Sequence, residues 1–346
     1  MKNRRILSFL LLAFGSTWLL AGVGAALGVR ATSGISYMVL AAGCMLMPAL
    51  AAIVQQRLIE RRPWGELGLS FKPMNWRMLG FTALVGMAII PTMLLVVHLL
   101  GDMFGIQVFG QMSITSERLL IQLQELMDAA GRTLPQATID RMASLPGWLV
   151  LVGGLFSSVF AACTVNLPFM LGEELGWRGY LYHATSTWSR FQRILVSGVV
   201  WGLWHAPLIL MGHNYPEHPI LGVPLMVVFC VLLAYLFDWT RTRVGAVWGP
   251  CLLHGIINGS AGLFALFVWS GHPLVCSPTG VAGFIALGVL CAIVFIFDRR
   301  ARPEIVLSQV PFSWLPNPTR PKPLRPPSMP SSTSSPRRKC ATTAAR

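Results

Sequence analysis

Residues 220–237 read ILGVPLMVVFCVLLAYLF, an apolar run without a charged side chain. The hydrocarbon core of a bilayer is about 30 Å thick and an α-helix rises about 1.5 Å per residue, so a run of about 18 residues or more is typical of a transmembrane helix. Eight such runs follow one another, at roughly 6–28, 35–56, 79–100, 147–171, 194–212, 220–237, 245–269 and 279–297. The sequence therefore predicts an all-α fold, a polytopic transmembrane helical bundle of about eight helices.

The composition of the whole chain agrees with a membrane protein. Of its 346 residues, 54% are hydrophobic and 12% are charged, whereas roughly 25% of an ordinary soluble domain is charged. The first run follows Met1-Lys2-Asn3-Arg4-Arg5, as in a signal peptide. That run exceeds the roughly 7–15 apolar residues of a signal sequence, so we expect an uncleaved first helix.

The basic residues predict the orientation of the bundle. A formal net charge of +14 would by itself also suit nucleic-acid binding. The lysines and arginines, however, gather at the N-terminus, in the tail and in short loops that fall on one side of an eight-helix bundle, whereas the loop at about 101–146 on the other side carries five acidic residues. This positive-inside pattern places both termini in the cytoplasm and makes the lipid bilayer, with no nucleic acid, the expected partner.

Two segments outside the apolar runs have their own composition. We assign residues 1–300 to the transmembrane domain. Ten of the chain's 24 prolines lie in the last 44 residues, mixed with Ser, Thr, Arg and Lys, so residues 301–346 are predicted to form a disordered, Pro-rich and basic cytoplasmic tail. In the outer loop, leucines recur at helical spacing between residues 114 and 129, which predicts a short amphipathic helix on the outer surface.

Charged residues near the end of the fourth run require a reason, because a charge within an apolar span costs several kcal/mol unless it is paired or solvated. Glu173 and Glu174 form the one adjacent acidic pair of the sequence, and Arg178 follows four residues after Glu174. Residues four apart share a helix face, so Glu174 and Arg178 are expected to neutralise each other. Glu173 then lies on another face without a local cation, which suits a general base. Alternatively, both glutamates mark the membrane surface where the helix exits.

Polar side chains also occur inside the fifth and seventh runs. His205 lies in the fifth, and His254 and Asn258 lie in the seventh at a spacing that puts both on one helix face. Both helices enter from the cytoplasmic side in the predicted topology, so these groups lie at comparable depth. Gly202, Gly249 and Gly255 would allow close approach of the helices. A lone histidine in such a helix is usually a hydrogen-bonded structural residue, but two at matched depth beside a buried glutamate favour a site.

At this point the residues resemble the CPBP intramembrane protease family, which includes the type II CAAX prenyl endopeptidases and bacteriocin-processing or immunity proteins. The family's EExxxR motif appears as Glu173-Glu174-Leu-Gly-Trp-Arg178. Its FxxxH motif appears as Trp201-Gly-Leu-Trp-His205, and its HxxxN/D motif as His254-Gly-Ile-Ile-Asn258. Order and spacing agree over roughly 147–270, and Trp201 in place of Phe is the one departure.

The resemblance implies an endopeptidase that hydrolyses peptide bonds within the membrane, and two mechanisms fit its residues. In the first, Glu173 and His205 activate a water while His254 and Asn258 donate hydrogen bonds to the oxyanion, without a metal. In the second, Glu173, His205 and His254 hold a zinc ion whose bound water is the nucleophile. We favour the first, because Asn is a poor zinc ligand and a good oxyanion donor. The implied partners are membrane-embedded or lipid-anchored peptides, and the compact core is similar to bacterial members, which implies a multi-pass protein of a bacterial plasma membrane.

Two other classes of protein remain open. A non-catalytic immunity or scaffold protein of the same fold would keep the helices without the chemistry, and it would tolerate Glu173→Ala. A transporter would also place polar groups inside helices, but it would usually show repeated halves or discontinuous helices around its site.

Overall fold

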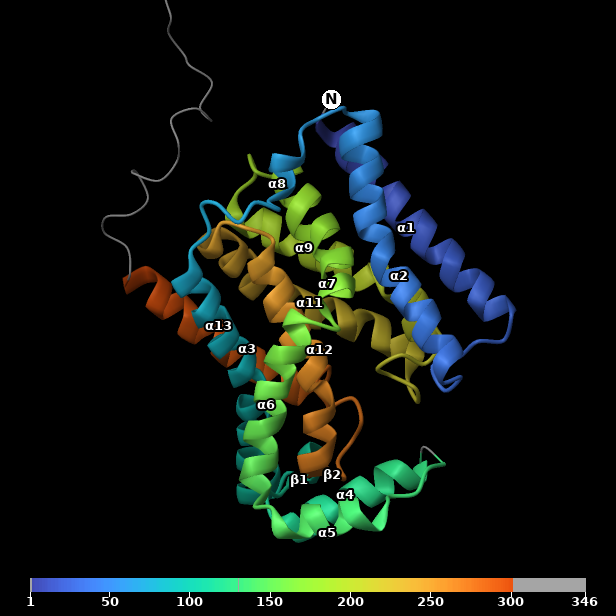
Figure 1. The fold of residues 1–346 in the computed structure, drawn as a ribbon, viewed down its shortest axis with the longest axis vertical. Coiled ribbons are helices and arrows are strands. Elements are labelled where there is room, and N and C mark those ends of the chain that lie inside the picture. Colours follow the sequence, from blue (N-terminus) through green and yellow to red (C-terminus); the bar gives the residue numbers. More distant parts are fainter. Residues whose placement is uncertain (1, 130, 301–346) are drawn as a thin grey trace, which may run out of the picture. The chain divides into compact units, whose positions relative to one another are not determined.

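The computed structural model describes residues 2–129 and 131–300. In this part of the chain, seven helical segments are long and apolar enough to cross a membrane. Figure 1 shows them packed as a bundle, which confirms the predicted all-α, polytopic fold. The segments are Arg4–Ala26 in α1 (Lys2–Ala26); Ile35–Ile59, made of α2 (Ile35–Ile53) and the π-helical η1 (Val54–Ile59); Trp76–Met103, made of α3 (Trp76–Val97) and η3 (His98–Met103); Arg190–Leu210, made of α9 (Arg190–Trp204) and α10 (Ala206–Leu210); α11 (Pro219–Val244); α12 (Trp248–Phe267); and Val281–Asp298 in α13 (Val281–Arg300).

The fourth apolar run differs from its prediction as one continuous helix over 147–171. The chain forms α6 (Gly147–Cys163), turns at residues 164–166 and starts again as α7 (Leu167–Glu174). Pro168 lies in the first turn of α7, where the missing N–H of a proline costs no helical hydrogen bond. The adjacent glutamates are the last two residues of α7. The π-helical η5 (Leu175–Leu181) and α8 (Tyr182–Ala184) follow directly. Helix α6 has 17 residues, slightly fewer than the roughly 18 that cross a bilayer, and α5 (Gln136–Ser144) precedes it at a bend of 109°.

The predicted glycine contacts are present between the helices. A Cβ at Gly202 would collide with the backbone of Val227 in α11, and one at Gly255 would collide with Ala162 in α6. Gly249 likewise lies against Thr240 of α11. These positions allow backbones to approach closely where van der Waals packing stabilises helix pairs in lipid.

Two further glycines bring α7 and η5 against α2. A Cβ at Gly172 would collide with the carbonyl oxygen of Met45, and one at Gly176 would collide with Pro48. The stretch that carries both glutamates is therefore held directly against a neighbouring transmembrane helix.

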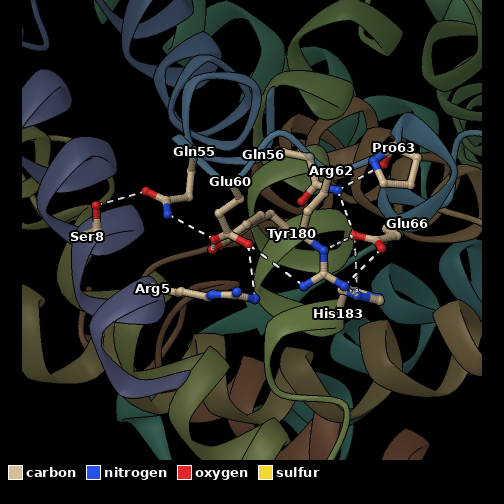
Figure 2. Close-up of polar contacts among 10 residues, drawn as sticks. All are labelled: Arg5, Ser8, Gln55, Gln56, Glu60, Arg62, Pro63, Glu66, Tyr180 and His183. Carbon is tan, nitrogen blue, oxygen red and sulfur yellow. Dashed lines mark hydrogen bonds and ion pairs between the residues drawn. The ribbon is translucent and has the colours of Figure 1, made fainter. Parts of the chain in front are cut away.

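A polar network ties one end of α1 and α2 to the helix that follows the glutamates (Figure 2). Glu60 accepts hydrogen bonds from the Tyr180 hydroxyl and from Gln55, and it pairs with Arg5 at 3.4 Å. A second carboxylate, Glu66, accepts a hydrogen bond from Gln56 and forms an ion pair with Arg62, and His183 lies beside it.

The outer loop contains the predicted amphipathic helix as α4 (Ser116–Ala129), which buries Leu119. Helices α4 and α5 lie at the end of the bundle opposite the N-terminus (Figure 1). Strand β1 (Gln111–Met112) pairs antiparallel with β2 (Val268–Trp269) beside them. The predicted tail, residues 301–346, lies outside the described residues.

Candidate active site

The adjacent glutamates and Arg178 lie in the interior of the bundle. Glu173 is 2% exposed, Glu174 is 0% exposed and Arg178 is 2% exposed. Both glutamates are therefore enclosed by the bundle and do not lie on its outer surface. Nη1 of Arg178 lies 3.2 Å from Oε1 of Glu174, which confirms the predicted ion pair one helical turn apart.

Glu174 has a second partner that sequence spacing did not predict. Its Oε1 lies 2.8 Å from Nδ1 of His254, on α12. A carboxylate oxygen accepts, so the ring carries its proton on Nδ1 and donates it to Glu174. Glu174 thus connects Arg178 to His254 and fixes the orientation of the imidazole.

Glu173 points away from this pair and takes a hydrogen bond from α9. Nε1 of Trp201 donates to Oε2 of Glu173 at 2.8 Å. The guanidinium carbon of Arg178 lies 4.4 Å from the centre of the Trp201 ring and 4.2 Å from that of Phe237. A cation over aromatic faces is stabilised by the ring quadrupoles, so Arg178 is held by Glu174 and by two rings.

His205 lies at the point where α9 gives way to α10. Its backbone N–H bonds to the Gly202 carbonyl, three residues back, at 3.2 Å. The Trp201 carbonyl is thereby released from the regular helical pattern, and it accepts a hydrogen bond from Nδ1 of the His205 ring at 2.8 Å. A carbonyl can only accept, so Nδ1 carries the proton and Nε2 has a free lone pair when the ring is neutral.

Four of the predicted side chains meet at one cavity of about 160 Å³, lined in part by Glu173, His205, His254 and Asn258. His254 and Asn258 both face this cavity from α12, as their spacing predicted. The Asn258 amide nitrogen also lies 3.7 Å from the sulfur of Met170. All six predicted site residues are thus in one region: four at the cavity, and Glu174 and Arg178 in the layer behind it.

A second cavity of about 500 Å³ adjoins the first. Asn258 and Ile257 are among the residues that line both. The larger cavity has apolar side chains from α3, among them Ile90 and Met93, and it reaches Ser277 in the loop before α13. The larger cavity therefore offers apolar walls beside the polar cluster.

The three candidate zinc ligands are of a suitable chemical type, but their side chains are not close enough to one another to bind one ion. Glu173, His205 and His254 together would make a His₂Glu set of the kind zinc accepts. Among residues 2–129 and 131–300, however, no three His, Cys, Asp or Glu side chains are grouped closely enough to hold one metal ion. This arrangement of the three side chains therefore does not fit a zinc ion.

Comparison with known proteins finds a family that the segment carrying the cluster resembles. Residues 146–260 match the family model described as type II CAAX prenyl endopeptidase Rce1-like. The chain is also 46% identical to "CAAX prenyl protease 2" of Methanococcus maripaludis over 44 residues, which cover 12% of this chain and 16% of the relative. The matched segment thus spans about a sixth of that relative's length.

The fold and the cluster define a multi-pass membrane protein with a polar site inside its helical bundle. Its residues 146–260 are similar to the type II CAAX prenyl endopeptidase Rce1-like family, in agreement with the resemblance that the sequence motifs indicated. The matched range includes all six predicted site residues, from Glu173 to Asn258.

Proposed function

We propose that this chain is an intramembrane endopeptidase that hydrolyses peptide bonds of membrane-embedded or lipid-anchored substrates. The observation that carries the proposal is the convergence of Glu173, His205, His254 and Asn258 on one cavity inside the bundle. Two of these are a carboxylate and an imidazole that can take a proton, and the other two can donate hydrogen bonds. This is the set of groups that acyl transfer to water requires.

Water activation falls to Glu173 and His205. Oε2 of Glu173 already accepts from Trp201, so the other carboxylate oxygen is the one that takes a proton from water. Nε2 of His205 accepts the second hydrogen bond and aims a lone pair of the water at the scissile carbonyl carbon. The proton passes from Glu173 to the departing amine when the tetrahedral intermediate collapses.

Oxyanion stabilisation falls to Asn258 and His254. The Asn258 amide donates N–H directly. His254 has its Nδ1–H committed to Glu174, so Nε2 donates to the oxyanion when the ring carries both protons. The Glu174 carboxylate holds the ring in this orientation, which gives the second glutamate of the motif a role distinct from that of the first.

The substrate class follows from the adjoining apolar cavity and the relatives. An apolar body in the larger cavity would leave a peptide bond beside Glu173, which suits a lipid-anchored peptide or a membrane segment. The matching family and the curated relative are both named as CAAX prenyl proteases. A prenylated C-terminal peptide is therefore the first substrate to test. The proposed location is the plasma membrane of a bacterium.

The transporter alternative shares one feature with this chain, the break between α6 and α7. Discontinuous helices in transporters expose backbone groups to a substrate or ion. Here the backbone N–H groups at the break already bond within the same segment, those of Thr164 and Asn166 to the Ala161 carbonyl and that of Leu167 to the Thr164 carbonyl. We therefore favour hydrolysis.

The test is cleavage of a panel of prenylated and unprenylated membrane peptides by the purified full chain in detergent. Wild type is compared with Glu173→Gln, which keeps the size of the side chain and removes the base. Glu117→Gln, on exposed α4, is the matched control. We expect cleavage by wild type and the control and loss in Glu173→Gln. If folded wild-type protein cleaves none of the peptides, the scaffold alternative is favoured. If Glu173→Gln cleaves as fast as wild type, the proposed mechanism is wrong.

A further inference from the structure

Trp201 contacts both groups that activate water in the proposed mechanism. Its indole Nε1 donates to Oε2 of Glu173, and its backbone carbonyl accepts from Nδ1 of His205, both at 2.8 Å. We propose that Trp201 is a positioning residue for hydrolysis, one that holds the Glu173 carboxylate with its second oxygen available to water. This inference rests on the proposed endopeptidase function.

The surroundings of the indole make it a strong donor. Arg178 lies over its face, with 4.4 Å between the guanidinium carbon and the ring centre. A cation over the ring draws electron density from it and strengthens the hydrogen bond that its N–H makes in a low-dielectric interior. Trp201 is 2% exposed and also meets the His254 ring edge to face, with 5.4 Å between ring centres. The indole therefore stands among Glu173, Arg178 and His254 and has little freedom to turn.

A purely structural role would also bury an indole and pair its N–H. In this bundle, burial alone does not bring an acceptor, since Nε1 of Trp177 is buried without a hydrogen-bond partner among the described residues. Trp201 instead meets the carboxylate that lines the cavity with His205.

The motif offers a conservative variant. The FxxxH motif that the sequence resembles has Phe where this chain has Trp201, and a Phe ring keeps the aromatic packing but has no N–H. Glu173 of this chain therefore receives a hydrogen bond that a Phe at this position could not supply. Trp201→Phe removes that bond while keeping a residue that the family accepts in the same place.

The experiment compares steady-state cleavage by the full chain as wild type, Trp201→Phe and Trp248→Phe. Trp248 is the matched control, because its Nε1 donates to the Leu69 carbonyl at 3.1 Å, away from the cavity. Because hydrogen bonds to charged groups carry more free energy than neutral ones, we expect Trp201→Phe to lower kcat about tenfold. KM should change little, whereas the smaller ring should lower the apparent Tm. A third variant with benzothienylalanine at position 201 keeps the bicyclic shape, replaces N–H by sulfur and should show the same loss.

A spectroscopic arm tests the hydrogen bond without catalysis. The Raman difference between wild type and Trp201→Phe isolates the indole band of Trp201, which should report a hydrogen-bonded N–H and should lose that signature in Glu173→Leu. An unbonded band, or a kcat in Trp201→Phe and the benzothienylalanine variant within twofold of wild type, overturns the inference. If folded wild-type protein cleaves no peptide, the proposed function is wrong instead. This outcome is seen in the wild-type assay, before any variant is compared.

Discussion

Nδ1 of His254 lies 2.8 Å from Oε1 of Glu174, although the two residues are 80 positions apart in the chain. The same oxygen meets Arg178 at 3.2 Å. The neighbouring Glu173 takes part in neither contact and instead accepts from Trp201. Adjacent side chains on a helix diverge by about 100°, and here that divergence divides the glutamates between an inner layer at the cavity and an outer layer that orients an imidazole.

Glu174→Gln is expected to weaken both stability and activity. A glutamine keeps the size of the side chain but leaves the buried guanidinium of Arg178 without a countercharge, and breaking a buried pair in this way costs about 3–5 kcal/mol. His254 also loses the carboxylate that orients its ring. We expect an apparent Tm lower by several degrees and a kcat at least tenfold lower, measured by thermal unfolding and cleavage in detergent. Glu125→Gln, exposed on α4, should match wild type, and a fully active and stable Glu174→Gln would contradict the layered arrangement.

Asn258→Ala is expected to act on kcat rather than on KM. The Asn258 amide faces the cavity with His205 and His254, and an oxyanion donor makes its bond more strongly in the transition state than in the ground state. Removal of one such donor costs about 100-fold to 1,000-fold in kcat. Initial rates over a range of substrate concentrations check this split. A raised KM with an unchanged kcat would show that Asn258 binds substrate instead.

Chelation separates the two mechanisms that the motifs allow. The described side chains do not group Glu173, His205 and His254 as ligands of one ion, so we expect cleavage to continue after dialysis against a strong zinc chelator. Metal analysis of the active preparation should show far less than one zinc per chain. Loss of cleavage on chelation, restored by added zinc and by no other treatment, would establish the zinc mechanism.

The fold followed from sequence because bilayer thickness fixes the length of an apolar run, and the runs are long. The break at residues 164–166 was missed because the run stays apolar across it, although Pro168 is a local signal for a helix start. Contacts one helical turn apart, such as Glu174 with Arg178, were predictable from spacing. Contacts between helices were not, since Trp201 and Glu173 meet only through the packing of α9 against its neighbours.

The network in Figure 2 includes two titratable side chains that lie outside the membrane-spanning segments, Glu66 and His183. It predicts how the stability of the folded chain depends on pH. Burial acts to raise the pKa of Glu66, but hydrogen bonds from Gln56 and Arg62 and the charges of Arg62 and His183 outweigh it and lower the pKa below its ordinary value. Burial lowers the pKa of His183 below its ordinary 6.5, with Arg62 and Arg241 acting in the same direction and the carboxylates of Glu66 and Glu60 opposing them. Nε2 of His183 lies 3.3 Å from Nη2 of Arg62, as a neutral ring that accepts would.

Both shifts make the chain less stable as the pH falls. Below about 6.5 the unfolded chain protonates His183 before the folded protein does, and below about 4.5 the same holds for Glu66, so the unfolded state binds more protons in each range. Thermal unfolding from pH 7.5 to 4 should show a falling apparent Tm in wild type. Because other groups also titrate, the comparison that matters is with two variants. His183→Gln should flatten the curve just below about pH 6.5, and Glu66→Gln should flatten it below about pH 4.5. A wild-type curve that both variants reproduce would mean that this network does not set the acid response of the fold.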